Sequence, residues 1–88
     1  MWTDEQVKGK ILHKLTRKGK FEHSHTALDN LQKSFPPELK GKAKKMSEDL
    51  IKEGILYLKK TSYGKQVSIN VDKKDKVMEY IDEFLRMD

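Results

Sequence analysis

The amino-acid sequence predicts an α+β fold: a three-helix core, a β-hairpin and an additional C-terminal helix. Four stretches carry apolar residues at intervals of three and four, which is the periodicity of an amphipathic helix. Between the third and fourth stretches, apolar and polar residues alternate within about 55–71, as in a half-buried hairpin. A chain of 88 residues has room for one domain, so we expect 1–88 to fold as a single unit.

The first helix is predicted over about 4–18 from the signals at both of its ends. Thr3 and Gln6 have the spacing of a capping box, and Trp2 and Val7 have that of a hydrophobic staple. Gly19 indicates the end, because glycine readily adopts the left-handed conformation that terminates helices. The apolar face of this helix consists of Val7, Ile11, Leu12 and Leu15.

A short edge strand is expected over about 20–23, followed by a second helix over about 26–34. Thr26 and Asp29 resemble a second capping box at the start of that helix. Phe35 precedes two prolines and should end it, because a residue before proline is pushed out of helical geometry. The apolar stripe of this helix is Leu28, Leu31 and Phe35.

The third helix is predicted over about 38–53. Pro37 suits a first helical position, and Gly54 indicates the end of the helix. Its buried face should consist of Leu39, Ala43, Met46 and Leu50.

The hairpin follows over about 55–71, with a turn at 61–64. Leu56 and Leu58 should face the same core as the alternating residues Val67, Ile69 and Val71. Asp72 and Asp75 then resemble a start signal for a fourth helix over about 73–87. Its apolar face would consist of Val77, Tyr80, Ile81, Phe84 and Leu85.

The composition indicates a basic intracellular protein, which we expect in the cytoplasm. There is no cysteine, and the longest apolar run, Ile55-Leu56-Tyr57-Leu58, is too short for a signal peptide or a membrane span. The net charge is +5, with +4 on residues 36–66 and −2 on residues 67–88. This asymmetry favours a polyanion partner on one side, although a solvated lysine-rich surface would give the same pattern.

The order helix, short strand, helix, tight turn, helix, hairpin, helix resembles that of the winged helix-turn-helix superfamily, including its small archaeal and bacterial DNA-binding members. The junction that carries the resemblance is Leu50-Ile51-Lys52-Glu53-Gly54-Ile55-Leu56. The resemblance implies that the third helix enters the DNA major groove and that the hairpin, called the wing, contacts the neighbouring backbone. It implies a small transcriptional regulator or a nucleoid-type protein that binds duplex DNA.

Two basic elements match the positions that this resemblance implies for DNA contact. On the outward face of the third helix, lysines would meet phosphates and Gly41 would let the backbone come close. At the wing tip, lysines and hydroxyls are suited to phosphate, and Tyr63 could pack on a sugar or a base. The candidate DNA-binding residues are Lys40, Gly41, Lys44, Lys45, Lys59, Lys60, Thr61, Ser62, Tyr63 and Lys65. The alternative for the wing lysines is protection of an exposed strand edge against aggregation.

The same residues favour backbone binding over base reading. Lysine makes up 17 of the 19 basic residues, and the outward face of the third helix has no Arg, Asn or Gln to read bases bidentately. Glu48 on this face could accept a hydrogen bond from cytosine, but a pair with Lys52 four residues later is the simpler interpretation.

Three acidic or histidine groupings invite a metal or catalytic interpretation that the sequence does not favour. His23 and His25 have the spacing of two ligands on a strand, yet a zinc site normally needs three or four. Ser24, His25 and Asp29 contain triad residue types, which is weak evidence without geometry. Asp49 and Glu53 lie one helical turn apart, and Lys45 should pair with Asp49 instead. We therefore expect no enzyme, no metal and no cofactor.

The fourth helix leaves two further options open. Its apolar residues either complete the core or form a homodimer, with Met78, Ile81, Phe84 and Leu85 as the candidate dimer interface. With Glu79, Asp82 and Glu83 on its other side, this helix could instead bind a protein partner, and the domain would be an interaction module.

RNA is a third possible partner of the chain. In that case Tyr63, at the wing tip, would stack on an unpaired base.

Overall fold

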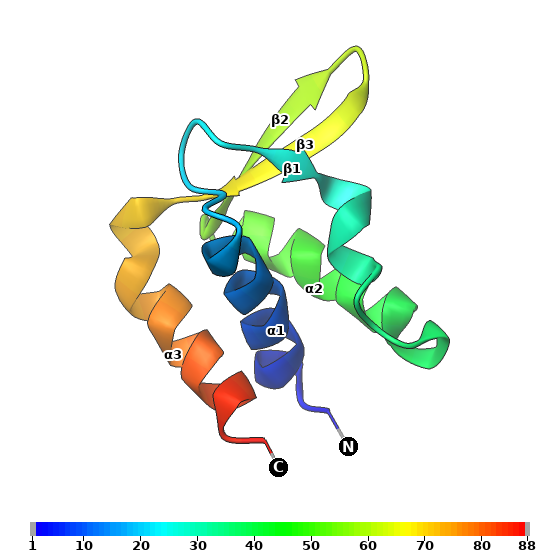
Figure 1. Cartoon of the computed structure of the whole chain (residues 1–88), viewed down its shortest axis with the longest axis vertical. Coiled ribbons are helices and arrows are strands. Elements are labelled where there is room, and N and C mark those ends of the chain that lie inside the picture. Colours follow the sequence, from blue (N-terminus) through cyan, green and yellow to red (C-terminus); the bar gives the residue numbers. More distant parts are fainter. Residues whose placement is uncertain (1, 88) are drawn as a thin grey trace.

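The computed structural model describes residues 2–87, which form an α+β structure with three α-helices and one three-stranded antiparallel sheet (Figure 1). The helices are α1 (Asp4–Arg17), α2 (Lys40–Lys52) and α3 (Lys74–Leu85). The strands are β1 (Thr26–Ala27), β2 (Leu56–Thr61) and β3 (Gly64–Ile69). Short 3₁₀ segments, η1 (Leu28–Gln32), η2 (Pro37–Leu39) and η3 (Val71–Lys73), lead into or connect these elements.

The sheet is a long hairpin with a two-residue strand added at one edge. Its strand order is β1-β3-β2, and both pairings are antiparallel. Within the hairpin, Leu56 pairs with Ile69 at the base and Thr61 with Gly64 at the tip. The tip projects away from the helices (Figure 1). The far half of the hairpin is therefore free to contact another molecule.

The helices pack around α1, which lies between α3 and α2 (Figure 1). The residues of its predicted apolar face are at most 1 % exposed, which confirms that face. The core joins all three helices, η1 and the base of the hairpin. Its members are Val7, Ile11, Leu12, Leu15, Leu31, Phe35, Ala43, Met46, Leu50, Ile55, Leu56, Val67, Ile69, Val77, Tyr80 and Ile81.

Several end signals read from the sequence are confirmed. The Gln6 amide donates to the Thr3 hydroxyl over 3.1 Å, and the Thr3 amide donates to the Gln6 side chain over 2.8 Å, so the capping box is complete. Gly54 has a φ of +77° just after α2, the left-handed conformation expected there. The staple between Trp2 and Val7 stays a prediction; the contacts that the structure gives for Trp2 are with the rings of Phe35 and Phe84, whose centroids lie 5.9 and 6.1 Å from its own.

The second predicted helix is wrong. Thr26 and Ala27 form β1, which pairs with Val67 and Gln66, and only a 3₁₀ segment over 28–32 follows. The edge strand expected at 20–23 is reduced to a single bridge between Phe21 and Ile69. Tertiary pairing with β3 overrides the local capping signal, because backbone groups of the connection gain partners on the sheet.

Two details of the hairpin and the last helix also differ from expectation. Leu58 is 37 % exposed although its partner Val67 is fully buried, because β2 is an edge strand and β3 lies in the middle of the sheet. Val71, which was also expected to face the core, begins η3 and is 40 % exposed. The cap before the last helix is Asn70, whose side chain accepts from the Asp72 amide over 3.0 Å, and it starts η3. No helix within residues 2–87 is long and apolar enough to span a membrane.

Candidate nucleic-acid interface

The outward face of α2 is a row of exposed side chains. Because Ala43, Met46 and Leu50 point into the core, residues on the other side of the helix must face solvent. Lys40, Gly41 and the other outward positions are all exposed; these are Lys44, Lys45, Glu48 and Lys52. No atom lies within 4 Å of a Cβ built on Gly41, so the helix surface is open there.

Ion pairing separates the lysines of α2 into two groups. Lys42 points toward α1 and holds Asp4 at 2.8 Å, and the hydrogen bond and charge of Lys42 lower the pKa of Asp4. The other lysines of α2 form no ion pair with any residue of 2–87; these are Lys40, Lys44, Lys45 and Lys52. The outward face of α2 therefore carries positive charge without internal compensation.

The pairs expected along α2 are not formed. Neither Glu48 with Lys52 nor Lys45 with Asp49 comes within ion-pair distance among the described residues. Glu53, at the end of the helix, accepts hydrogen bonds from Lys8 of α1 and from Tyr80 of α3. Glu48 remains as the one acidic group on the outward face, where it would oppose a phosphate.

The hairpin tip is shaped by Thr61. Its hydroxyl donates to the Gly64 carbonyl over 2.8 Å and accepts from the Tyr63 amide over 3.2 Å. Thr61 is therefore committed to the turn, and Ser62 is the exposed hydroxyl at the tip. Tyr63 is 95 % exposed, so its ring is available to a partner. Around them, Lys59, Lys60 and Lys65 are exposed and form no ion pair within 2–87.

The base of the hairpin has the opposite charge on one face. Partial burial, followed by the nearby carboxylates of Glu22 and Asp72, raises the pKa of Tyr57. These carboxylates would repel phosphate near Tyr57. A polyanion approaching the hairpin would therefore contact its tip.

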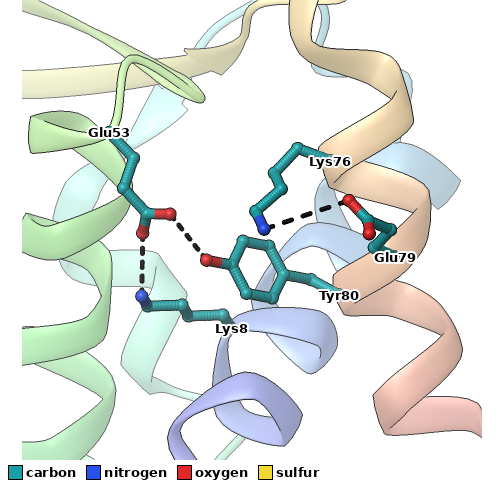
Figure 2. A network of polar contacts seen from close by, with 5 residues as sticks. All are labelled: Lys8, Glu53, Lys76, Glu79 and Tyr80. Atoms are coloured by element: carbon teal, nitrogen blue, oxygen red, sulfur yellow. Dashed lines mark hydrogen bonds and ion pairs between the residues drawn. The ribbon is translucent and has the colours of Figure 1, made fainter.

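A network of hydrogen bonds and an ion pair joins α1, α3 and the end of α2. Glu53, at the end of α2, accepts from Lys8 of α1 over 2.7 Å and from the Tyr80 hydroxyl of α3 over 2.6 Å (Figure 2). Lys8 and Lys76 both lie near the Tyr80 ring, 5.2 and 5.3 Å from its centroid. The network thus connects the end of α2, immediately before the hairpin, to α1 and α3.

The titration of this network follows from its contacts. Burial by itself would raise the pKa of the Glu53 carboxyl, but the hydrogen bonds from Lys8 and Tyr80 outweigh it and hold that pKa below the ordinary value. Burial and the hydrogen bond to Glu53 raise the pKa of Tyr80. Burial lowers the pKa of Lys8, but the hydrogen bond and charge of Glu53 outweigh it and raise that pKa overall. The pKa of Glu53 is lowered and the pKa of Lys8 is raised, as expected for a charged pair, and the Tyr80 hydroxyl donates to the same carboxylate. We assign the network a structural role.

The histidine and serine candidates form no hydrogen bond with one another. Ser24 and Asp29 are exposed and His25 is half-buried. Within residues 2–87, no group of three or more His, Asp or Glu side chains could hold a metal ion.

The candidate dimer residues of α3 divide into two pairs. Met78 and Leu85 are 51 % and 58 % exposed, so they are available to a partner. Ile81 is 3 % exposed and belongs to the core, and Phe84 is half-buried against Trp2. An interface through this helix would therefore rest on Met78 and Leu85.

Comparison with known proteins adds no relative to this picture. No protein-family model, curated protein or solved structure matches the chain. A function for the chain must therefore be argued from its own side chains and their arrangement.

Proposed function

We propose that the chain is a small cytoplasmic winged-helix protein that binds duplex DNA through α2 and the hairpin. It would act as a transcriptional regulator or a nucleoid-type protein, without enzymatic activity. The observation that carries the proposal is the uncompensated charge on two neighbouring elements. Four lysines of α2 and three of the hairpin tip are exposed without a carboxylate partner among the described residues.

The arrangement of elements supports the same proposal. The order α1, β1, η1, α2, β2–β3 hairpin, α3 is compatible with a winged helix, except that a 3₁₀ segment stands at the place of its second helix. α2 contacts β2, so the helix and the hairpin that follows it are neighbours in the structure. Such a unit could place α2 at a groove while the tip reaches the next phosphates.

The chemistry of these side chains favours contact with the backbone. Lysine is a compact point charge suited to phosphate, whereas bidentate base reading needs Arg, Asn or Gln. Binding should therefore depend steeply on salt and weakly on sequence. About four to six phosphate contacts give a log–log salt slope near −4 to −5.

The test is a titration of a fluorescent random-sequence duplex with the wild type and the double variant Lys44→Glu/Lys45→Glu. Removing two contacts should weaken binding and reduce the salt slope by about 2. A matched control is Lys73→Glu/Lys74→Glu, which makes the same change of charge at exposed positions at the start of α3. The control should retain more of the affinity, because those lysines lie outside the α2 face.

Two results would reject the proposal for α2. One is wild-type affinity in a folded Lys44→Glu/Lys45→Glu variant. The other is an equal loss in both double variants, which would indicate a response to net charge alone. A flat salt dependence would reject the phosphate contacts altogether.

A protein-interaction module is the second candidate, and the surface of α3 favours it. Met78 and Leu85 are exposed apolar residues beside the exposed acidic residues Glu79, Asp82 and Glu83. Such a surface suits a basic, partly apolar partner or a second copy of the chain. Sedimentation of the wild type and of Leu85→Glu would separate self-association from a monomer.

A further inference from the structure

A second cationic surface lies on α1, in a groove that the sequence did not indicate. The groove has a volume of about 470 Å³, within the range of small-molecule sites, which is roughly 300–1,000 Å³. It is lined by one side of α1, by Phe84 of α3 and by Ser34. The α1 residues that line it are Lys10, His13, Lys14, Arg17 and Lys18.

The charge in this groove is not balanced from within it. None of the seven described residues that line it is acidic, and none of its cations forms an ion pair with a residue of 2–87. Partial burial, together with the charges of Lys18, Lys10 and Lys33, lowers the pKa of Lys14. An anion in the groove would relieve this repulsion.

The groove also has an aromatic side. The His13 ring lies 5.5 Å from the Phe84 ring, centroid to centroid, and Phe84 stacks on Trp2. Lys10 lies over the rings of Phe35 and Trp2, at 4.9 and 5.4 Å from their centroids. Arg17, one of the two arginines in the chain, supplies the planar fork that binds phosphate bidentately.

We propose that this groove binds a nucleotide, with the base against Phe84 and His13 and the phosphates among Arg17, Lys14 and Lys18. An aromatic body and an anionic group are the two chemical features that the lining side chains match. A plain anion would leave the ring side unused, and an uncharged ring would leave the cations unpaired. The proposal does not depend on DNA binding by α2.

The groove and the outward face of α2 share no residue. Lys10, Lys14 and Arg17 recur at intervals of four and three, so they share one side of α1; Lys10 and Lys14 are half-buried there and Arg17 is exposed. The residues that line the groove belong to α1 and α3, with Ser34 between η1 and η2, and none of them belongs to α2 or to the hairpin. Substitutions can therefore change one cationic surface and leave every side chain of the other in place.

The experiment compares ADP with its two halves, adenosine and pyrophosphate, at low salt. The single Trp2 stacks on Phe84 and provides a fluorescence signal, and amide shifts locate the site. ADP should bind at least about tenfold more tightly than either half, with shifts confined to 10–18, 34 and 84. A single-stranded oligonucleotide is the second probe. Displacement of ADP by the strand would assign the nucleotide to a nucleic acid end or loop, and no displacement would assign it to a free nucleotide.

Substitutions in the groove and in α2 distinguish nucleotide binding by the groove from duplex binding by α2. Arg17→Gln, at an exposed position, should weaken ADP about tenfold or more and leave duplex binding within twofold. Phe84→Leu should remove the advantage of ADP over pyrophosphate. The matched control is Lys44→Gln, which removes the same charge from α2 and should leave ADP binding unchanged.

The proposal is overturned if pyrophosphate binds as tightly as ADP, because the aromatic side would then contribute nothing. It is also overturned if ADP shifts map to α2 and the hairpin, or if Arg17→Gln and Lys44→Gln weaken ADP equally. Arg17→Gln changes no buried side chain, so the test does not depend on whether Phe84→Leu folds.

Discussion

Gly9 of α1 faces the backbone of α3, and its replacement by alanine should destabilise the fold. A Cβ there would overlap the Tyr80 carbonyl oxygen and lie 2.8 Å from the Phe84 Cβ. Since ordinary contact begins near 3.4 Å, Phe84 alone would have to retreat by 0.6 Å, and Tyr80 by more. α3 cannot move without disturbing the Trp2 stack and the bond from Tyr80 to Glu53.

The expected size of the effect combines three contributions. Overpacking costs about 1–3 kcal/mol, and a weakened hydrogen bond adds about 1 kcal/mol. Alanine gains about 1 kcal/mol over glycine within a helix, which offsets part of this. The net loss is about 1–3 kcal/mol, or a fall in Tm of about 5–20 °C for a chain of this size.

The assay is thermal and urea unfolding followed by circular dichroism. Gly41→Ala in α2 is the matched control, because nothing lies within 4 Å of a Cβ at that position. The control should be as stable as the wild type or up to about 1 kcal/mol more stable. If Gly9→Ala were as stable as Gly41→Ala, the close approach of α1 and α3 would be wrong.

Gly41→Ala also tests whether DNA approaches the α2 backbone, since an added methyl group would then weaken duplex binding.

Three further predictions concern caps, charge and pH. Thr3→Ala removes one side of the capping box and should cost about 1 kcal/mol in urea unfolding; no change would mean that the box contributes nothing. Glu48→Gln removes the carboxylate from the outward face of α2 and should strengthen duplex binding at low salt, with a smaller gain at high salt; weaker binding would instead indicate a base contact. Glu53→Gln should lose about 1–2 kcal/mol near neutral pH. Because the folded pKa of Glu53 is lowered, its contribution is present above the ordinary pKa, about 4.3, and is lost as the pH falls through the folded value. The difference between Glu53→Gln and the wild type should therefore narrow in acid, and a constant difference from pH 7 to pH 3 would contradict the assignment.

Local signals in the sequence were sufficient for the elements whose ends are fixed by neighbouring residues. The box of Thr3 and Gln6 and the positive φ of Gly54 both act within one helical turn, so α1 and the end of α2 followed from spacing. The strand at Thr26 and Ala27 did not follow from spacing, because the residues that pair with it, Val67 and Gln66, lie about forty residues away. A 3₁₀ segment can also bury an apolar pair three residues apart, so the stripe in this segment fitted either helix type.

The candidate surfaces show the same limit. The exposure of Lys44 and Lys45 followed from helical periodicity alone. Which lysines of α2 form an ion pair did not follow from it. Lys42 lies among these lysines in sequence, yet it is paired with Asp4 of another helix. The groove on α1 needs Ser34 and Phe84, which approach only when three separate segments pack together. No spacing rule along one helix could have indicated it.

The charge that remains unpaired also decides how the molecule would approach a polyanion. The carboxylates of α3, Glu79, Asp82 and Glu83, face solvent on a helix that packs on α1, and α1 separates it from α2 (Figure 1). If the proposed function is correct, a duplex would be repelled from these carboxylates and attracted to α2, to the hairpin tip and to the cations on α1. The charges are unevenly distributed without being fully separated, because Lys76 lies 3.9 Å from Glu79 and Arg86 lies 3.8 Å from Glu83. Since two cationic surfaces would then compete for phosphate, the Arg17→Gln and Lys44→Glu/Lys45→Glu variants are both needed to assign duplex binding to one of them.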